Sequence, residues 1–505
     1  MLARTALVAS LLLIPAGPGD LQVAQRWISI GPHGGDVRAL AVDPASPNRI
    51  YLGTAGGNLY RSESSGLNWQ RLSPGFPRRD QNLDEIVVGR PGSLLIGFWD
   101  VHGRGGGVAV SGDHGVTFAI TLDGESVRAL ALAPSDPGLA VAGALSGVFG
   151  SSDGGLHWRR ISPAGHKELR NIESIAIDPR DPRVIYAGTW HLPWKTTDGG
   201  VSWRPVHAGM IEDSDVFTMT LDRRNPEVIH ATACSGIYRS ANGAARWSRV
   251  YGIPFGSRRS RAFAQDRLRP DTFYAGTTEG LWVSSDDSVT WRPATPLDVV
   301  VNAIVALPDG SVLAGTDGAG VLRSPDHGRT WAPANAGFSE RFVSRIAFDP
   351  ASPRVLVSVW GDRRHSGVFS APTPRGVWGR LGDGLKGREV VSLAVLGSRP
   401  LAGTDQGLFA LGSLDGVWRL LALQGDQRGP HPRVNDVATL HNDVVVAATS
   451  VGLFRSEDMA ASWRLVLKDV GETTVIALSA AGELSLAAPL DVRQDSIELW
   501  TRFQN

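Results

Sequence analysis

A repeat of about 44 residues runs through nearly the whole chain of 505 residues, and it limits the possible fold more than any other feature. Each unit ends at an aromatic residue, and an eleventh, partial unit begins near Thr474. The ten unit-ending aromatics are Trp69, Phe118, Trp158, Trp203, Trp247, Trp291, Trp331, Trp378, Trp418 and Trp463. Units of this kind bury their apolar faces against one another, so the chain is an array of similar modules and not one large core.

Each unit holds four short apolar runs, which alternate with polar residues as strands do. In the first unit they cover residues 37–42, 50–53, 59–62 and 69–73. Proline after Asp43 stops the first run, and the same D-P-x-x-P turn recurs after Asp178 and Asp349. Repeated four-stranded antiparallel units of this length predict an all-β fold, a β-propeller of about 10–11 blades. We expect one large ring, with two smaller propellers divided after Trp331 as the alternative.

The two ends of the chain predict how the propeller closes. Residues 27–31 resemble a fourth strand that precedes the first unit, whereas the last unit lacks a convincing fourth strand. The repeat region is therefore expected to span residues 27–505, with the strand at 27–31 completing the last blade.

Residues 1–24 are expected to be a signal peptide whose cleavage site is not defined. Arg4 precedes an apolar run at residues 6–14, and prolines and glycines follow that run. No other segment has the roughly 18 apolar residues of a membrane helix. We therefore expect an exported protein, periplasmic or extracellular. The alternative is that the apolar run forms a buried N-terminal strand.

The composition excludes several classes of function. Lys and Arg together number 50, as do Asp and Glu, so the zero net charge argues against a nucleic-acid partner. Cys234 is the single cysteine, which excludes a disulfide scaffold and cysteine-based zinc or iron–sulfur sites. The 60 glycines agree with a chain that is rich in turns.

The turn before the unit-ending aromatic carries the motif S/T-x-D-x-G-x-x-W. Full copies occupy residues 151–158, 196–203 and 324–331, and several degenerate copies follow the same spacing. The chain thereby resembles the Asp-box, or BNR-repeat, propellers. The motif's aspartate can accept hydrogen bonds from its own turn, so we expect a structural role on the face opposite the usual binding face. These structural aspartates are Asp113, Asp153, Asp198, Asp286, Asp326 and Asp458.

The resemblance includes sialidases, xyloglucan-active endoglucanases, the sortilin receptor domain and photosystem II assembly factors. Sialidases of this kind carry an R-I-P motif, which this chain lacks. The endoglucanases carry a catalytic aspartate in a T-D-x-G-G-x-Y-R segment, and the matching residues 54–61 have Ala55 at the aspartate position. Glycoside cleavage normally needs two carboxylates. The sequence therefore favours a binding protein over a hydrolase, and it identifies no catalytic residue.

Three connections between the second and third strands of a unit are longer than the others, and each places a tryptophan at the same position. Aromatic rings beside His, Asp and Arg suit recognition of a carbohydrate or a peptide. The alternative is that these loops pack their own tryptophans as local cores. The candidate ligand-binding residues are Trp99, Asp100, His102, Trp190, His191, Trp194, Trp360, Asp362, Arg363 and His365.

Two Asp/His pairs in these loops lack a third ligand, so no metal site is predicted, and no cofactor is expected. The basic run at residues 258–261 is expected to be a solvated loop, with contact to an acidic partner as the alternative. The leading prediction is an exported, non-enzymatic binding or scaffold propeller that recognises a protein segment or glycan. The alternative is a polysaccharide-active glycoside hydrolase of the Asp-box type. The oligomeric state is left open.

Overall fold

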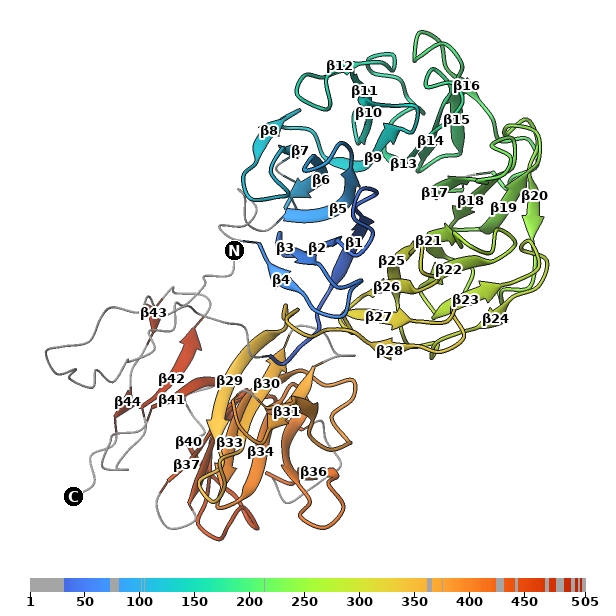
Figure 1. The fold of residues 1–505 in the computed structure, drawn as a ribbon. Coiled ribbons are helices and arrows are strands. Elements are labelled where there is room, and N and C mark those ends of the chain that lie inside the picture. The colour runs from blue at the N-terminus through green and yellow to red at the C-terminus, as the bar shows by residue number, and fades with distance from the viewer. Residues whose placement is uncertain are drawn as a thin grey trace, which may run out of the picture.

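The computed structural model describes the chain from residue 31, apart from residues 73–80, 101, 104, 213, 361–365, 375, 424–430, 441–443, 468–471, 478–485, 492–495, 498–499 and 502–505. The described chain is all-β, with 44 strands in eleven four-stranded antiparallel sheets (Figure 1). In ten of these sheets four consecutive strands pair in chain order. This confirms the predicted repeat of four-stranded propeller blades. The described elements are all strands, and the described residues contain no helix that could cross a membrane.

We number the blades in chain order, each with strands a to d. Blades 1 to 7 form a ring around a central channel, with the a strands innermost (Figure 1). Their strands are β1 (Val37–Val42), β2 (Ile50–Thr54), β3 (Leu59–Ser62), β4 (Gln70–Arg71); β5 (Gln81–Val88), β6 (Leu94–Asp100), β7 (Gly106–Ser111), β8 (Ala119–Thr121); β9 (Val127–Ala133), β10 (Asp136–Ala144), β11 (Gly147–Ser151), β12 (Arg159–Arg160); β13 (Ile172–Ile177), β14 (Ile185–Thr189), β15 (Pro193–Thr196), β16 (Arg204–Pro205); β17 (Val216–Leu221), β18 (Ile229–Ala233), β19 (Gly236–Ser240), β20 (Ser248–Val250); β21 (Ser260–Gln265), β22 (Phe273–Thr277), β23 (Leu281–Ser284), β24 (Arg292–Pro293); β25 (Val301–Ala306), β26 (Val312–Thr316), β27 (Val321–Ser324) and β28 (Ala332–Pro333).

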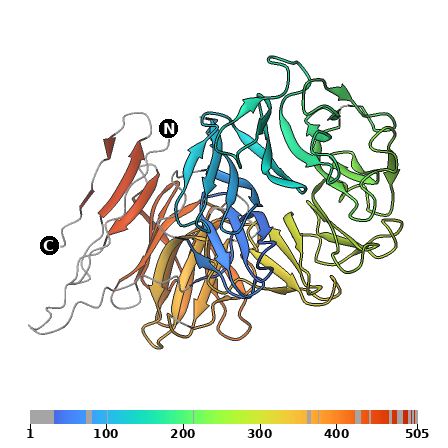
Figure 2. The ribbon, with the colours of Figure 1, turned by 45° about the horizontal axis from the view of Figure 1, so that its top comes forward.

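Blades 8 to 11 form a second unit beside the ring (Figures 1 and 2). In blade 11, β43 and β44 both pair with β42. The strands of the second unit are β29 (Phe342–Phe348), β30 (Val355–Trp360), β31 (Gly367–Ala371), β32 (Gly379–Arg380); β33 (Val390–Leu396), β34 (Arg399–Thr404), β35 (Gly407–Leu411), β36 (Trp418–Leu421); β37 (Val434–Thr439), β38 (Val445–Thr449), β39 (Gly452–Ser456), β40 (Arg464–Leu467); β41 (Thr473–Ala477), β42 (Leu486–Asp491), β43 (Ser496–Ile497) and β44 (Trp500–Thr501).

The ring closes between blades 7 and 1. The innermost strands β25 and β1 pack against each other, and one hydrophobic cluster joins the two blades. The Trp69 indole N–H donates to the Ala334 carbonyl oxygen at 2.8 Å. Trp247 of blade 5 makes the equivalent bond to the Val206 carbonyl at the end of the preceding blade. The closing contact is therefore the same contact that joins consecutive blades.

A glycine on strand b makes room for the next blade. A Cβ added at Gly315 in blade 7 would lie 2.4 Å from Cγ1 of Val37, the first residue of blade 1. Blade 5 has Thr232 at the glycine position, and blade 6 begins with the smaller Ser260. The remaining glycine pairings are Gly53 with Leu83, Gly97 with Val127, Gly143 with Ile172, Gly188 with Val216, Gly276 with Val301 and Gly403 with Val434.

The prediction of one large ring is wrong, and the alternative of two smaller units is closer to the structure. Seven blades complete every interface among themselves, so no place is left in that ring for blades 8 to 11. The division falls after Trp331, at the connection that leads from β28 to β29.

The predicted closing strand at residues 27–31 lies outside the described residues except for Gly31. All seven blades of the ring draw their four strands from residues 37–333, so the ring closes without that strand. Gly31 lies against Trp378 of blade 8, because an added Cβ would come within 2.5 Å of the indole Cδ1. That residues 27–31 complete the last blade stays a prediction.

The connection between the two units is anchored on blade 1. Ser339 forms a parallel bridge with Gly34, and Arg341 Nε donates to the His33 carbonyl at 2.9 Å. Glu340 accepts the Tyr60 hydroxyl at 2.6 Å. These bonds hold the start of blade 8 against the outside of the ring.

Candidate functional site

The Asp-box turns lie at one end of the ring's channel, together with the a–b turns. In blade 5, for example, Gly243 of the Asp-box turn donates its N–H to the carbonyl oxygen of Glu227 in the a–b turn at 2.9 Å. The b–c turns and the d–a connections lie at the opposite end, since the strands are antiparallel. We call these the Asp-box end and the loop end.

The Asp-box carboxylates are occupied by their own turns. Asp113 Oδ1 accepts the backbone N–H groups of Val116 and Thr117 at 3.0 and 2.9 Å, and Oδ2 accepts the Thr117 hydroxyl at 2.6 Å. These hydrogen bonds lower the pKa of Asp113 to about 2. Hydrogen bonds within the turn likewise lower the pKa of Asp153, Asp198, Asp286, Asp326 and Asp458.

The loop end of the channel is bordered by a repeated structural position. In every blade of the ring, the pairing of strands a and b shifts register directly after a fully buried residue of strand a, which is Val37 in blade 1. This irregularity is typical of a β-bulge, which redirects a side chain. The seven bulge residues are Arg38, Asp84, Arg128, Glu173, Phe217, Arg261 and Asn302.

The bulge residues of blades 2 to 4 form a cluster with two of the predicted tryptophans. The Arg128 guanidinium lies 4.4 Å from the ring centre of Trp99 and 5.6 Å from that of Trp190. Its Nη1 is 2.9 Å from Glu173 Oε1. The Trp99 indole N–H donates to Asp84, and that of Trp190 donates to Glu173 at 2.5 Å. Both carboxylates of this cluster therefore already have donors.

Burial raises the pKa of both Asp84 and Glu173. The Trp99 N–H opposes the shift at Asp84, and the Arg128 charge opposes it at Glu173. Glu85 follows Asp84 and lines the channel, where burial raises its pKa to about 8 with a further contribution from the Asp84 charge.

The opposite side of the channel mouth, from blades 6 and 1, is rich in arginine. Arg38 pairs with Asp36 at 2.9 Å, and burial raises the pKa of Asp36 to about 7. Arg261 has solvent access, yet burial and the charges of Arg38 and Arg259 lower its pKa. Among the described residues, neither Arg259 nor Arg261 forms an ion pair; Arg259 lies 5.4 Å from the Phe217 ring centre.

A cavity of about 270 Å³ lies between these two sides. Six of the seven bulge residues line it, and Thr218 and Ser174 add hydroxyl groups. The cavity places Arg261, which has no ion pair among the described residues, opposite Asp84 and Glu173, whose carboxylates already have donors. Such a mouth can accept an anionic group on a ligand.

Two other predicted residues of blades 2 and 4, Asp100 and Trp194, make contacts outside the cluster around Arg128. Asp100 is buried; it accepts the His102 backbone N–H at 2.7 Å and the Gln81 side-chain amide at 3.2 Å. Trp194 is also buried, within the hydrophobic cluster between blades 3 and 4, and it contacts His166 edge to face. This tryptophan packs as part of the core, as the alternative interpretation of the loops expected.

His191 is exposed, and its backbone N–H donates to the Thr189 hydroxyl at 2.8 Å, which fixes the tight turn that carries Trp190. Trp190 is 43% exposed. His191 therefore belongs to the turn that presents Trp190, while Trp190 itself reaches the channel mouth.

Trp360 lies in the second unit and therefore cannot join the same site. It is 40% exposed and contacts Phe342 edge to face at 5.4 Å between ring centres. The predicted residues Asp362, Arg363 and His365 lie outside the described residues, so their assignment stays a prediction.

The bulge residues were missed at the sequence level, although a signal was present. Aligned copies of the repeat have an apolar residue first in strand a, and the next residue is polar in most units, as in V-R-A, I-E-S and V-N-A. A polar residue inside an otherwise apolar inner strand indicates a channel-facing position. The pattern of the connections after strand b indicates Trp99 and Trp190, but it does not indicate the arginines and carboxylates between them.

Metal ligands do not gather in the described part of the chain: no three His, Cys, Asp or Glu side chains there could hold one ion. Ala55 lies in the b–c turn of blade 1, where the endoglucanase motif has its aspartate. Glu340 contacts this turn, since its carboxylate accepts the Asn58 amide at 2.8 Å.

Comparisons with known proteins find the same fold in solved structures. No protein-family model and no curated protein sequence matches the chain. A GH74 enzyme of Niastella koreensis superimposes with a TM-score of 0.66 at 15% identity, covering 88% of this chain and 74% of that one. The GH74 xyloglucanase of Xanthomonas campestris has a TM-score of 0.59 at 17% identity, covering 94% and 86%. YCF48 bound to a D1 peptide covers 58% of this chain and 94% of its own at 14% identity, with a TM-score of 0.45.

Proposed function

We propose that this chain is an exported, non-enzymatic binding protein whose seven-bladed ring holds an acidic protein segment at the loop end of its channel. Export rests on the apolar run at residues 6–14. The observation that carries the binding proposal is Arg261 in the cavity wall, with the charge of Arg259 near it, and neither arginine has an ion-pair partner among the described residues. A carboxylate is the natural partner of a guanidinium, because two parallel hydrogen bonds reinforce the charge attraction.

The geometry favours an acidic peptide over a neutral glycan. Sugars stack on open aromatic faces and donate hydroxyl groups to free acceptors. Here Arg128 covers one face of Trp99 at 4.4 Å, and Asp84 and Glu173 already accept indole N–H groups.

The same contacts argue against a hydrolase. Glycoside cleavage uses one carboxyl group as an acid and a second as base or nucleophile, and both must reach the scissile bond. Ala55 has no carboxyl group, and Asp84 and Glu173 at the channel mouth are held by Trp99 and Arg128.

Titration calorimetry with an Asp- and Glu-rich peptide library tests the proposal. We expect saturable binding that weakens as salt is raised, and a loss of about tenfold in Arg261→Ala, equivalent to about 1.4 kcal/mol. Arg246→Ala, on an exposed Asp-box turn, is the matched control and should bind like the wild type. Equal affinity in Arg261→Ala would contradict the proposal, as would release of reducing sugars from a polysaccharide.

A further inference from the structure

The Asp-box end of the ring's channel holds a second cavity, of about 780 Å³, which shares Met219, Thr220, Phe263 and Ile304 with the loop-end cavity but adds two arginines that the proposed function does not use. It is formed where the a strands of blades 4 to 7 end, with Val42 of blade 1 and Pro134 after strand a of blade 3. Met219, Phe263 and Ile304 contribute apolar surface, while Arg223 and Arg267 contribute two guanidinium groups. An apolar wall with a few convergent polar groups is the usual composition of a small-molecule site.

The two arginines have no acidic partner among the described residues. Arg267 is partly buried, and its Nε lies out of contact with solvent without a hydrogen-bond partner. The neighbouring Arg223 has its pKa lowered by burial and by the charge of Arg267, against a weaker opposite effect of Asp266. Two like charges side by side at the edge of an apolar cavity are unfavourable until an anion joins them.

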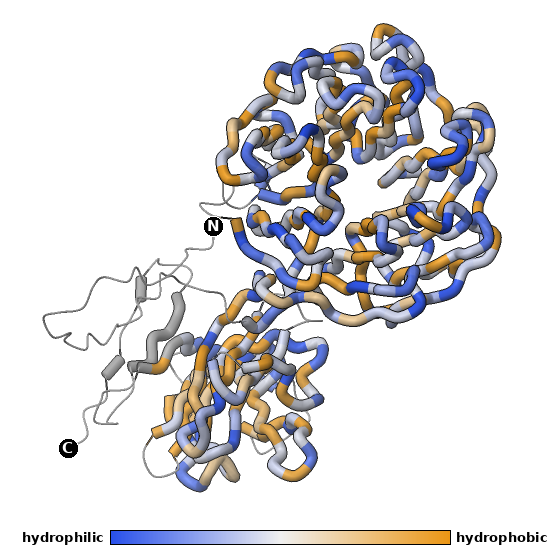
Figure 3. The backbone as a smooth tube through the Cα atoms, in the orientation of Figure 1, coloured by the Kyte–Doolittle hydropathy of each residue, from blue (hydrophilic) through white to orange (hydrophobic). Residues whose placement is uncertain are grey.

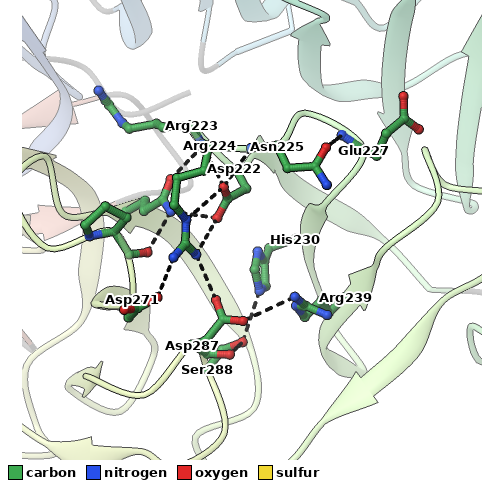
Figure 4. A network of polar contacts seen from close by, with 12 residues as sticks. Asp222, Arg223, Arg224, Asn225, Glu227, His230, Arg239, Asp271, Asp287 and Ser288 are labelled. Atoms are coloured by element: carbon green, nitrogen blue, oxygen red, sulfur yellow. Dashed lines mark hydrogen bonds and ion pairs between the residues drawn. The ribbon is translucent and has the colours of Figure 1, made fainter.

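The aspartates nearest to these arginines are already engaged by other groups. Asp222 accepts the Gln265 amide at 2.7 Å and pairs with Arg224 at 3.2 Å. Arg224 extends this network to Asp271 and Asp287, whereas the Arg223 side chain points away from the network (Figure 4).

Asp266, the other acid in reach, is also satisfied. Its Oδ2 accepts the Tyr274 hydroxyl at 2.6 Å and lies 2.9 Å from His327 Nδ1, and its Oδ1 accepts the backbone N–H groups of the following turn. The carboxylates around the cavity therefore leave the charges of Arg223 and Arg267 unneutralised.

We infer that this cavity binds an amphipathic carboxylate, with the carboxylate between Arg223 and Arg267 and the hydrocarbon chain against Met219, Phe263 and Ile304. The ligand class is a medium-chain fatty acid. The charge provides orientation through bidentate hydrogen bonds, and the apolar chain provides affinity through burial.

Calorimetry with decanoate as the probe, and decanol as the uncharged comparison, tests this site on the full chain. We expect saturable decanoate binding, at least tenfold weaker binding of decanol, and at least a tenfold loss for decanoate in the double variant Arg223→Gln, Arg267→Gln. Arg246→Gln, an exposed arginine of the Asp-box turn in blade 5, should leave binding unchanged.

Two outcomes would overturn the inference. One is the absence of saturable decanoate binding to the wild type. The other is equal affinity of the double variant, with its fold verified by circular dichroism. Binding of acidic peptides at the loop end should be the same in the double variant and the wild type, so this test is independent of the proposed function.

Discussion

The ring and the second unit use the same repeat, yet one residue position behaves differently in the two. The first residue of strand a is fully buried in the seven blades of the ring, as Val37 and Val301 illustrate. In blade 8 the equivalent Val343 is 36% exposed. Three residues further along, Leu40 is 8% exposed in blade 1, whereas Ile346 is 64% exposed in blade 8.

The difference shows that burial in a propeller is decided by the preceding blade. Blades 9 and 10 follow another blade, and their first residues, Val390 and Val434, are fully buried. Blade 7 precedes blade 8 in the chain, but it packs against blade 1 and closes the ring. It therefore does not cover β29, where Phe342, Ile346 and Phe348 remain exposed. Apolar residues gather along the strands of this unit in Figure 3.

The largest effect is expected from breaking the ring at its closing interface. Gly315→Val would place side-chain atoms inside the space held by Val37, because even an added Cβ lies 2.4 Å from Val37 Cγ1. We expect the free energy of unfolding to fall by about 3 kcal/mol or more.

Denaturant unfolding measures this loss, and hydrogen exchange should locate it in blades 7 and 1. Gly112→Ala is the control, since an added Cβ there meets nothing within 4 Å. Unchanged exchange protection in blades 7 and 1 of Gly315→Val would refute the closure of the ring at this interface.

A second test compares equivalent residues in the two units directly. Leu40→Ala removes a buried side chain from the cluster between blades 7 and 1, and it should cost about 2–3 kcal/mol of unfolding free energy. Ile346→Ala removes an exposed side chain, and it should change stability by less than about 0.5 kcal/mol. A loss of similar size in both variants, measured by denaturant unfolding, would show that β29 is covered in solution.

The smallest expected effect is the response of the two units to acid. The pKa values of Asp113 and Asp326 in the ring, and of Asp458 in the second unit, are lowered to about 2. A carboxylate with a lowered pKa in the folded state stabilises the fold above its unfolded pKa near 4, and this contribution is lost as the pH falls toward 2.

Five of the six Asp-box aspartates with lowered pKa values lie in the ring: Asp113, Asp153, Asp198, Asp286 and Asp326. The ring should therefore lose more hydrogen-exchange protection than the second unit between pH 4 and pH 2. Replacing Asp113 with Asn should reduce the loss in blade 2. Equal acid sensitivity of the two units would argue that these turns do not control stability.

The blades themselves were predictable because their signals are local. Strand a at Val37–Val42 and strand c at Leu59–Ser62 fall where the apolar alternation placed them, and the D-P-x-x-P turn after Asp43 ends strand a. The number of blades in a ring was not predictable in the same way. It depends on the angle between neighbouring blades, which no single unit encodes.

The candidate site was predicted only in part for a similar reason. Trp99 lies near the end of strand b in blade 2, and Trp190 directly follows strand b in blade 4, a pattern that can be recognised within one unit. Their common partner, Arg128, comes from the blade between them and is turned toward the channel by the bulge in its pairing. Trp194 lies in β15, where it pairs with Ala187 of β14 and packs in the hydrophobic cluster between blades 3 and 4.

By itself, the sequence determined the four-stranded unit, its turns and its repetition, because alternation, proline and the Asp-box act over a few residues. Only the tertiary structure decided that seven units close and four stand beside them, because closure requires Val37 to fit against Gly315, nearly 280 residues away. The tertiary structure likewise decided which charges meet at the channel ends. Among the described residues, Arg259 and Arg261 at one end, and Arg223 and Arg267 at the other, form no ion pair, while Asp36, Glu173, Asp222 and Asp266 bond to other groups.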